Sequence, residues 1–237
     1  MLKRLSSLGL LVLLALSAFS LNFTDYAVYN DIENGLKAAV LLEKSVLMVF
    51  TLPNCSTCGR LKNEALSNPT VEALLREHCV VIVAEAEKDR YAKFPFSAYV
   101  NPSSQSFETV NYYELITKKL GSNAVPFTIF LNPGLEMIGS TQSYNGYESY
   151  ESALKTFIRL NARNPKKVFK KITASEKELI LDTLPYAQEI GWEEFKAAIN
   201  NLDPLKVYIL SKVKVEEVRA VLDPLPLLRA DVLIQTK

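Results

Sequence analysis

Runs of apolar residues divide much of the chain into alternating strands and helices. Residues 46–50 and 80–84 are short and rich in β-branched side chains, which predicts buried strands. Residues 30–44 and 147–160 instead carry apolar side chains every three or four positions, which predicts amphipathic helices. The pattern is typical of an α/β domain, with helices packed on the faces of a sheet.

Two cysteines follow the first of these strands. Cys55 and Cys58 are spaced C-x-x-C after a Pro-Asn turn, where the helical pattern of residues 60–66 begins. The unpaired N–H groups at a helix N-terminus favour a thiolate, which is the attacking species in disulfide exchange. C-x-x-C also puts a second thiol within reach of the first. The pattern therefore predicts a redox centre in which Cys55 attacks and Cys58 resolves the mixed disulfide.

The cysteine pair has three other interpretations. Zinc needs four ligands, and only His78 and Cys79 remain to complete a set; being adjacent at the edge of a strand, they would point to opposite faces. Haem attachment needs a histidine after the second cysteine, but residue 59 is Gly. A purely structural disulfide stays open, although so short a loop removes little chain entropy. We expect no metal and no other cofactor, and we interpret Cys79 as a core residue.

A β-hairpin is predicted further along the chain, and an irregular stretch comes before it. The hairpin opens with Val125 and Pro126, where a missing N–H is tolerated, and turns at an Asn-Pro-Gly sequence. Residues 85–110 predict an insert with two strands, over residues 94–100 and 106–110.

The order of these elements resembles the thioredoxin fold, a central mixed sheet flanked by helices. The resemblance rests on Cys55-Ser-Thr-Cys58 after a buried strand, on Val125-Pro126 and on the Asn-Pro-Gly turn. It is greatest to exported thiol:disulfide interchange proteins. The resemblance implies an oxidoreductase for cysteine-containing proteins or peptides, recycled by a redox partner protein. It also implies that Pro126 is cis and faces the cysteines, and that Val125, Pro126 and Asn54 contact the substrate.

Two positions depart from the thioredoxin pattern. Asn54 stands where thioredoxins usually carry Trp, and Val49 stands where they carry a buried Asp that helps to deprotonate the second cysteine. The proton acceptor is therefore unassigned: Lys62, Glu64 and Glu85 are candidates, although a solvated surface charge is the more ordinary role for each. These departures favour a rival interpretation, a non-catalytic module that recruits a partner through its groove and its C-terminal tail.

The first residues have the pattern of a secretory signal peptide. Lys3 and Arg4 precede an apolar run over residues 8–16, and the small residues Ala18 and Ser20 follow. We expect residues 1–20 to be removed and the protein to work in the periplasm; it would contact the membrane if this segment stayed uncleaved. With 27 Lys and Arg against 26 Asp and Glu, the net charge of +1 gives no reason to expect a nucleic-acid partner.

The chain is thus predicted to have three parts. A signal peptide spans residues 1–20, a thioredoxin-like domain spans residues 21–162, and an all-helical extension spans residues 163–237. The extension carries a capping-box sequence at Ser175-Glu-Lys-Glu178 and helical stretches punctuated by prolines. It contains neither Cys nor His, so we expect thiol exchange to proceed without it.

Overall fold

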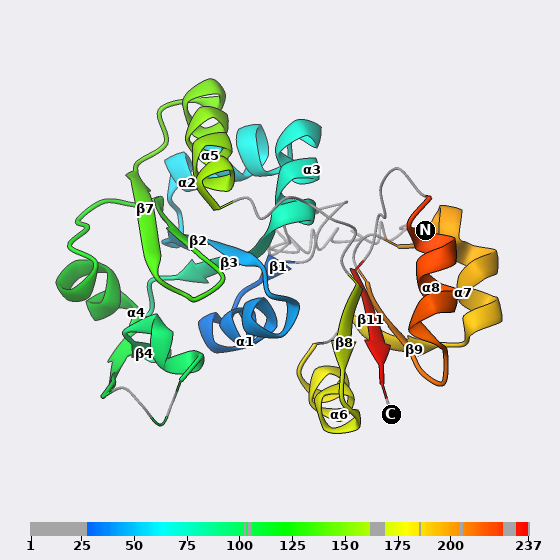
Figure 1. Ribbon diagram of the computed structural model, residues 1–237. Coiled ribbons are helices and arrows are strands. Elements are labelled where there is room, and N and C mark those ends of the chain that lie inside the picture. Colours follow the sequence, from blue (N-terminus) through cyan, green and yellow to red (C-terminus); the bar gives the residue numbers. More distant parts are fainter. Residues whose placement is uncertain are drawn as a thin grey trace, which may run out of the picture.

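The computed structural model shows two α/β units, each built around its own sheet (Figure 1). It describes residues 28–101, 103, 106–161, 169–184, 186–203, 206–224 and 231–236. The predicted signal peptide and the predicted border at residue 162 lie outside these residues. No helix in the described part of the chain is long and apolar enough to cross a membrane.

The first unit is a five-stranded mixed sheet in the order β1-β3-β2-β6-β7, the thioredoxin-like arrangement that the sequence predicts. β1, β3 and β2 run parallel, while β6 and β7 add an antiparallel hairpin. Its elements are β1 (Val28–Tyr29), α1 (Ile32–Leu42), β2 (Ser45–Thr51), α2 (Ser56–Arg60), the π-helical segment η1 (Leu61–Leu66), α3 (Pro69–His78), β3 (Cys79–Glu85), β6 (Phe127–Leu131), β7 (Met137–Gln142) and α5 (Tyr147–Asn161).

Strand β2 lies in the middle of this sheet and is buried on both faces. Val46, Met48 and Phe50 pack into the cluster that includes α1, while Leu47 and Val49 pack into the cluster formed with η1, α3 and α5. Side chains alternate along a strand, so a continuous apolar run supplies both cores at once. This explains why the segment reads as an unbroken hydrophobic stretch.

The predicted insert is a separate two-stranded antiparallel hairpin. β4 (Tyr91–Phe94) pairs with β5 (Glu108–Asn111), and α4 (Tyr112–Glu114) with the π-helical η3 (Leu115–Lys119) leads back to the sheet. The prediction of a strand over residues 94–100 was wrong, because Phe96–Tyr99 is a 3-10 turn, η2. Pro95 has no N–H to donate to a ladder, and β4 ends before it.

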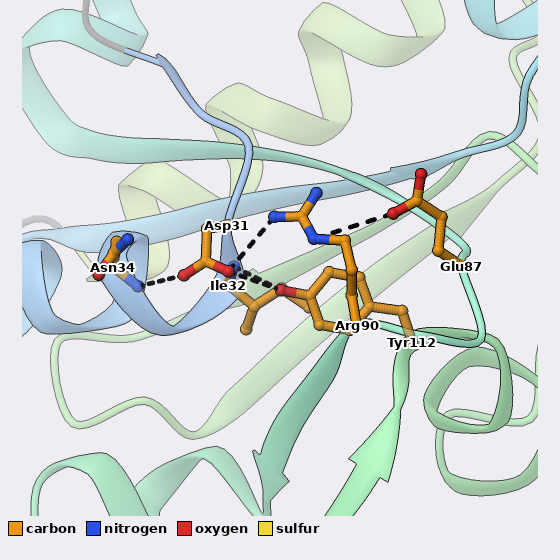
Figure 2. Close-up of polar contacts among 6 residues, drawn as sticks. All are labelled: Asp31, Ile32, Asn34, Glu87, Arg90 and Tyr112. Atoms are coloured by element: carbon orange, nitrogen blue, oxygen red, sulfur yellow. Dashed lines mark hydrogen bonds and ion pairs between the residues drawn. The ribbon is translucent and has the colours of Figure 1, made fainter.

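A polar network ties this insert to the start of α1 (Figure 2). The Tyr112 hydroxyl accepts from the Ile32 N–H at 2.9 Å and donates to an Asp31 carboxylate oxygen at 3.2 Å. Arg90 lies between the carboxylates of Asp31, at 3.3 Å, and Glu87, at 3.9 Å. The Ile32 N–H is one of the donors that the start of a helix leaves unpaired. The network therefore gives this donor an acceptor and also holds the insert against the start of α1.

The C-terminal extension is not all-helical, so that prediction was wrong. It forms a four-stranded parallel sheet in the order β8-β11-β10-β9. Its elements are β8 (Phe169–Ile172), α6 (Ala174–Thr183), β9 (Ala187–Ile190), α7 (Trp192–Ala198), the 3-10 turn η4 (Ile199–Asn201), β10 (Val207–Leu210), α8 (Val215–Leu222) and β11 (Asp231–Gln235). In apolar runs this short, periodicity does not separate a strand from a buried helix. The capping box is present, but Thr173 and Glu176 form it.

The second unit has a core of its own on one side of its sheet. Phe195 of α7 is fully buried there, among residues of β10, α8 and β11. Trp192, the only tryptophan of the chain, stacks on Phe195 with ring centroids 6.0 Å apart. This cluster does not include residues of the thioredoxin-like sheet.

The other side of the second sheet joins the core of the first unit. Ile180 of α6 belongs to the same buried cluster as Leu36 of α1. At the edge of this contact, Lys44 Nζ lies 2.7 Å from an Asp231 carboxylate oxygen. Lys44 precedes β2 and Asp231 opens β11, so the units meet at the amino ends of these strands. The carboxyl end of β2, which leads to the cysteines, therefore points away from the second unit.

Candidate redox site

The two cysteines lie where β2 runs into α2. Asn54 is exposed and has a left-handed backbone, with φ of 59°, a conformation that Asn adopts more readily than most residues. The chain thereby turns into α2 with Cys55 as its N-cap. Cys55 and Cys58 form a disulfide, with their Cα atoms 5.2 Å apart and an S–S distance of 2.18 Å.

The two sulfurs have different surroundings. Cys58 is only 2% exposed, whereas Cys55 is half-buried and reaches the surface. The Cys58 N–H donates to Cys55 Sγ at 3.1 Å. A backbone donor aimed at this sulfur stabilises negative charge that develops there when the disulfide opens. The geometry therefore suits Cys55 to meet another molecule and Cys58 to react only with Cys55.

The hairpin brings Val125 and Pro126 to the same edge of the sheet. β2 and β6 are antiparallel, with Phe50 opposite Phe127. One step further along this register, Pro126 lies beside Thr51, the last residue of β2. The Val125–Pro126 peptide bond is cis, Pro126 is buried and Val125 is partly exposed. Thus the two residues implied by the thioredoxin resemblance and the C-x-x-C turn leave the sheet at one edge.

The loop after β7 also borders this edge, although no pattern in the sequence indicates it. The Ser143 N–H donates to the Pro126 carbonyl at 2.9 Å. The next residue, Tyr144, is buried, and its ring centroid lies 5.6 Å from the guanidinium carbon of Arg60. Burial and then the carboxylate of Glu64 raise the pKa of Tyr144 to about 12, so this phenol is neutral at ordinary pH. No periodic pattern marks such a loop, since its contacts arise only from the fold.

The proton acceptor for Cys58 stays unassigned. Val49, at the position of the usual Asp, is fully buried among apolar side chains. Of the three charged candidates, Lys62 lies in η1, and Glu64 is held in an ion pair that lowers its pKa. Glu85 pairs in register with Thr51, at the carboxyl end of β2. Glu85 is thus the candidate that the sheet brings to the edge of the site.

The remaining thiol is in the interior. Cys79 opens β3 and is 8% exposed, and burial raises its pKa to about 12. His78, the other ligand considered for zinc, ends α3 directly before it. Among the described residues, no group of three or more His, Cys, Asp or Glu side chains is placed to hold a metal ion. Cys79 is therefore not placed to react with another molecule, and thiol exchange falls to the Cys55–Cys58 pair.

The first unit is the part of the chain that matches a known protein family. The model of the thioredoxin-like domain family matches residues 32–158, from α1 into α5. No curated protein matches the chain in sequence. Similar solved structures include a thioredoxin from Thermus thermophilus, which is 16% identical over 56% of this chain and 86% of its own, with a TM-score of 0.42. The oxidised C-terminal domain of DsbD from Neisseria meningitidis is 13% identical over 57% of this chain and 100% of its own, with a TM-score of 0.36.

Proposed function

Because the chain belongs to the thioredoxin-like domain family and carries the C-x-x-C disulfide of a thiol–disulfide oxidoreductase, we propose that it exchanges disulfides with cysteine-containing proteins or peptides outside the cytoplasm. The observation that carries this proposal is the Cys55–Cys58 pair at the start of α2, with one sulfur accessible and the other buried. No cofactor is required, since the electrons move between sulfurs.

In the reducing direction, the Cys55 thiolate attacks a substrate disulfide, and one substrate sulfur leaves as a thiolate. The Cys58 thiolate then attacks Cys55 Sγ, which releases the second substrate thiolate and forms the Cys55–Cys58 disulfide. Two electrons have passed from the protein to the substrate, and a redox partner protein returns them. In the oxidising direction the same steps run backwards.

The substrate segment lies along the edge formed by Asn54, Val125 and Pro126. Val125 lies two residues before Phe127, the first residue of β6 that pairs with β2 and β7, so its backbone groups are available to an extended chain in the manner of an added strand. Pro126 and Asn54 are the other two residues proposed to contact this segment.

The test is to replace each cysteine and isolate the protein without reductant. Cys58→Ser should accumulate mixed disulfides through Cys55, while Cys55→Ser should capture little, and the buried-thiol control Cys79→Ala should behave like the parent. Non-reducing electrophoresis with mass spectrometry identifies the linked cysteine. Equal capture by the Cys55 and Cys58 variants would contradict the assigned roles.

The N-terminal pattern supports the proposed location. The supporting observations are the basic start at Lys3 and Arg4, the apolar run and the small residues Ala18 and Ser20. N-terminal sequencing of protein recovered from the periplasm should give a chain that starts just after residue 20. A chain that starts at Met1 would refute cleavage and indicate an anchor.

A second candidate function is that of a binding module that does not catalyse thiol–disulfide exchange. Two observations favour it: position 49 holds a buried Val instead of an acid, and position 54 holds Asn instead of Trp. Insulin reduction with dithiothreitol separates the two functions. An inert parent protein, with no capture by any cysteine variant, would favour the binding module.

A further inference from the structure

The insert begins at the edge of the sheet that carries the cysteines. The Ala86 N–H donates to the carbonyl of Thr51, the last residue of β2, at 2.9 Å. The following residue, Glu87, accepts from the Tyr113 N–H at 3.2 Å, which closes the base of the insert. Figure 1 shows β4 and α4 on the side of the sheet where β2 leads into α2. The insert and the turn that leads to Cys55 therefore leave the sheet at the same end of β2.

The hairpin of the insert has one buried face and one open face. Ala92 of β4 and Val110 of β5 are buried in the main core. The alternate positions point the other way. Tyr91, at 55% exposure, Phe107, at 42%, and the exposed Thr109 belong to this outer side. We call the outer side chains of residues 91, 93, 107 and 109 the insert face.

Two lysines lie against aromatic rings of this region. Lys93 Nζ is 5.1 Å from the ring centroid of Phe107 and 5.5 Å from that of Tyr99. At the base of the insert, Lys88 Nζ is 5.2 Å from the ring centroid of Tyr113, which is 43% exposed. Neither lysine makes an ion pair with any residue that the structure describes. Their charges are thus available to a ligand.

The carboxylates near the insert face are mostly neutralised by other cations. Three of them form ion pairs: Glu87 with Arg90, Glu108 with Lys119, and Glu114 with Lys118. Asp89 is exposed, but it lies outside the insert face, directly after Lys88 at the base of the insert and before β4. The insert face therefore combines exposed aromatic rings with the positive charge of Lys93.

We propose that the insert face binds an extended segment, containing acidic and apolar side chains, of the same protein whose cysteine reacts with Cys55. This inference rests on the proposed function and names its substrate class. Positive charge beside aromatic rings is complementary to carboxylates and apolar side chains. A four-residue strand spans about 13 Å, so a ligand that covers the face and also reaches Cys55 must be a polypeptide. A small thiol reaches only the cysteine.

The probes are two peptides, each carrying one cysteine as a mixed disulfide with 2-nitro-5-thiobenzoate. The long peptide flanks its cysteine on both sides with six residues rich in Leu, Asp and Glu, and the short one is Gly-Cys-Gly. In the reduced Cys58→Ser protein, the Cys55 thiolate attacks the peptide sulfur and forms a Cys55–peptide disulfide. The bond between peptide and thiobenzoate breaks, and nitrothiobenzoate leaves with the electron pair, so its absorbance gives the rate.

The long peptide should react about tenfold faster than Gly-Cys-Gly, as expected for one or two aromatic and charge contacts of ordinary strength. Adding Tyr91→Ser and Phe107→Ser should remove most of this advantage and leave the Gly-Cys-Gly rate unchanged. Adding Lys93→Glu should slow the acidic peptide and speed a version in which Lys replaces Asp and Glu. The matched control is Leu179→Ser, an equally exposed apolar residue of α6, 53% exposed, which should change neither rate.

The outcomes separate this inference from the proposed function. If the insert variants keep the full advantage of the long peptide, or slow both peptides equally, the inference is overturned while the reaction of Cys55 stands. The same holds if the Lys-rich and acidic peptides react equally with the parent. If neither peptide reacts, the proposed function fails and the inference fails with it.

Discussion

Replacing Tyr112 by Phe tests whether the network in Figure 2 holds the insert in place. The change removes one oxygen and keeps a ring that is fully buried. The lost hydroxyl accepts from the Ile32 N–H at 2.9 Å and donates to Asp31 at 3.2 Å. Asp31 keeps its contact with Arg90, whereas the Ile32 N–H loses its acceptor.

The expected cost follows from this asymmetry. A buried donor left without an acceptor costs about 1–3 kcal/mol, and the loss of the second, partly compensated bond adds little, so we expect about 2 kcal/mol for Tyr112→Phe. In a protein of this size each kcal/mol lowers the melting temperature by about 2–4 °C, which gives a shift of about 4–8 °C.

Urea unfolding followed by far-UV circular dichroism measures this change. The matched control is Tyr113→Phe, at the neighbouring but 43% exposed position, where we expect a change within about 0.5 kcal/mol. Amide exchange at Ile32 should also become faster in Tyr112→Phe only. If both variants lose equally little stability, the network does not hold the insert and the reasoning is refuted.

Two further predictions concern the second unit and the buried phenols and thiol. A chain ending at residue 161 should still reduce insulin, because the units meet at the amino ends of their strands. It should unfold at a lower urea concentration, since Leu36 loses its packing contacts with the second unit. A folded, inactive truncation would contradict this. Burial raises the pKa of Tyr112, from 10.0, and of Cys79, from 9.0, to about 12. The unfolded chain therefore loses these protons first, so the free energy of unfolding should fall between about pH 9 and pH 12, and a constant urea midpoint over this range would refute the assignment.

The first unit could be predicted because its signals are local. The run before Cys55 is apolar at every position, since β2 is buried on both faces, and the turn and C-x-x-C follow directly. The second unit could not be predicted in the same way. β10, Val207–Leu210, is buried at all four positions, and such a run reads equally well as one turn of a buried helix. Parallel pairing with β9 and β11, which no local pattern encodes, makes it a strand.

The residues of the site also divide into those with a local signal in the sequence and those without one. Cys55, Cys58 and Pro126 could be found because their chemistry and spacing are visible in the chain itself. Tyr144 and Ser143 could not, because they border the site only after β6 and β7 fold back beside β2. The outward face of the insert was missed for a related reason: the strands were placed a few residues away, and a one-residue shift in register exchanges buried and exposed side chains.

The position of Trp192 gives the chain a built-in optical label. As the only indole, it lies in the second unit, stacked on Phe195, while Asn54 occupies the position beside the cysteines where thioredoxins usually carry Trp. Intrinsic fluorescence of the unlabelled protein therefore reports on the C-terminal sheet and its surroundings. Titrating a candidate docking partner and following the emission thus monitors one end of the molecule while absorbance-based thiol assays monitor the other, in the same cuvette.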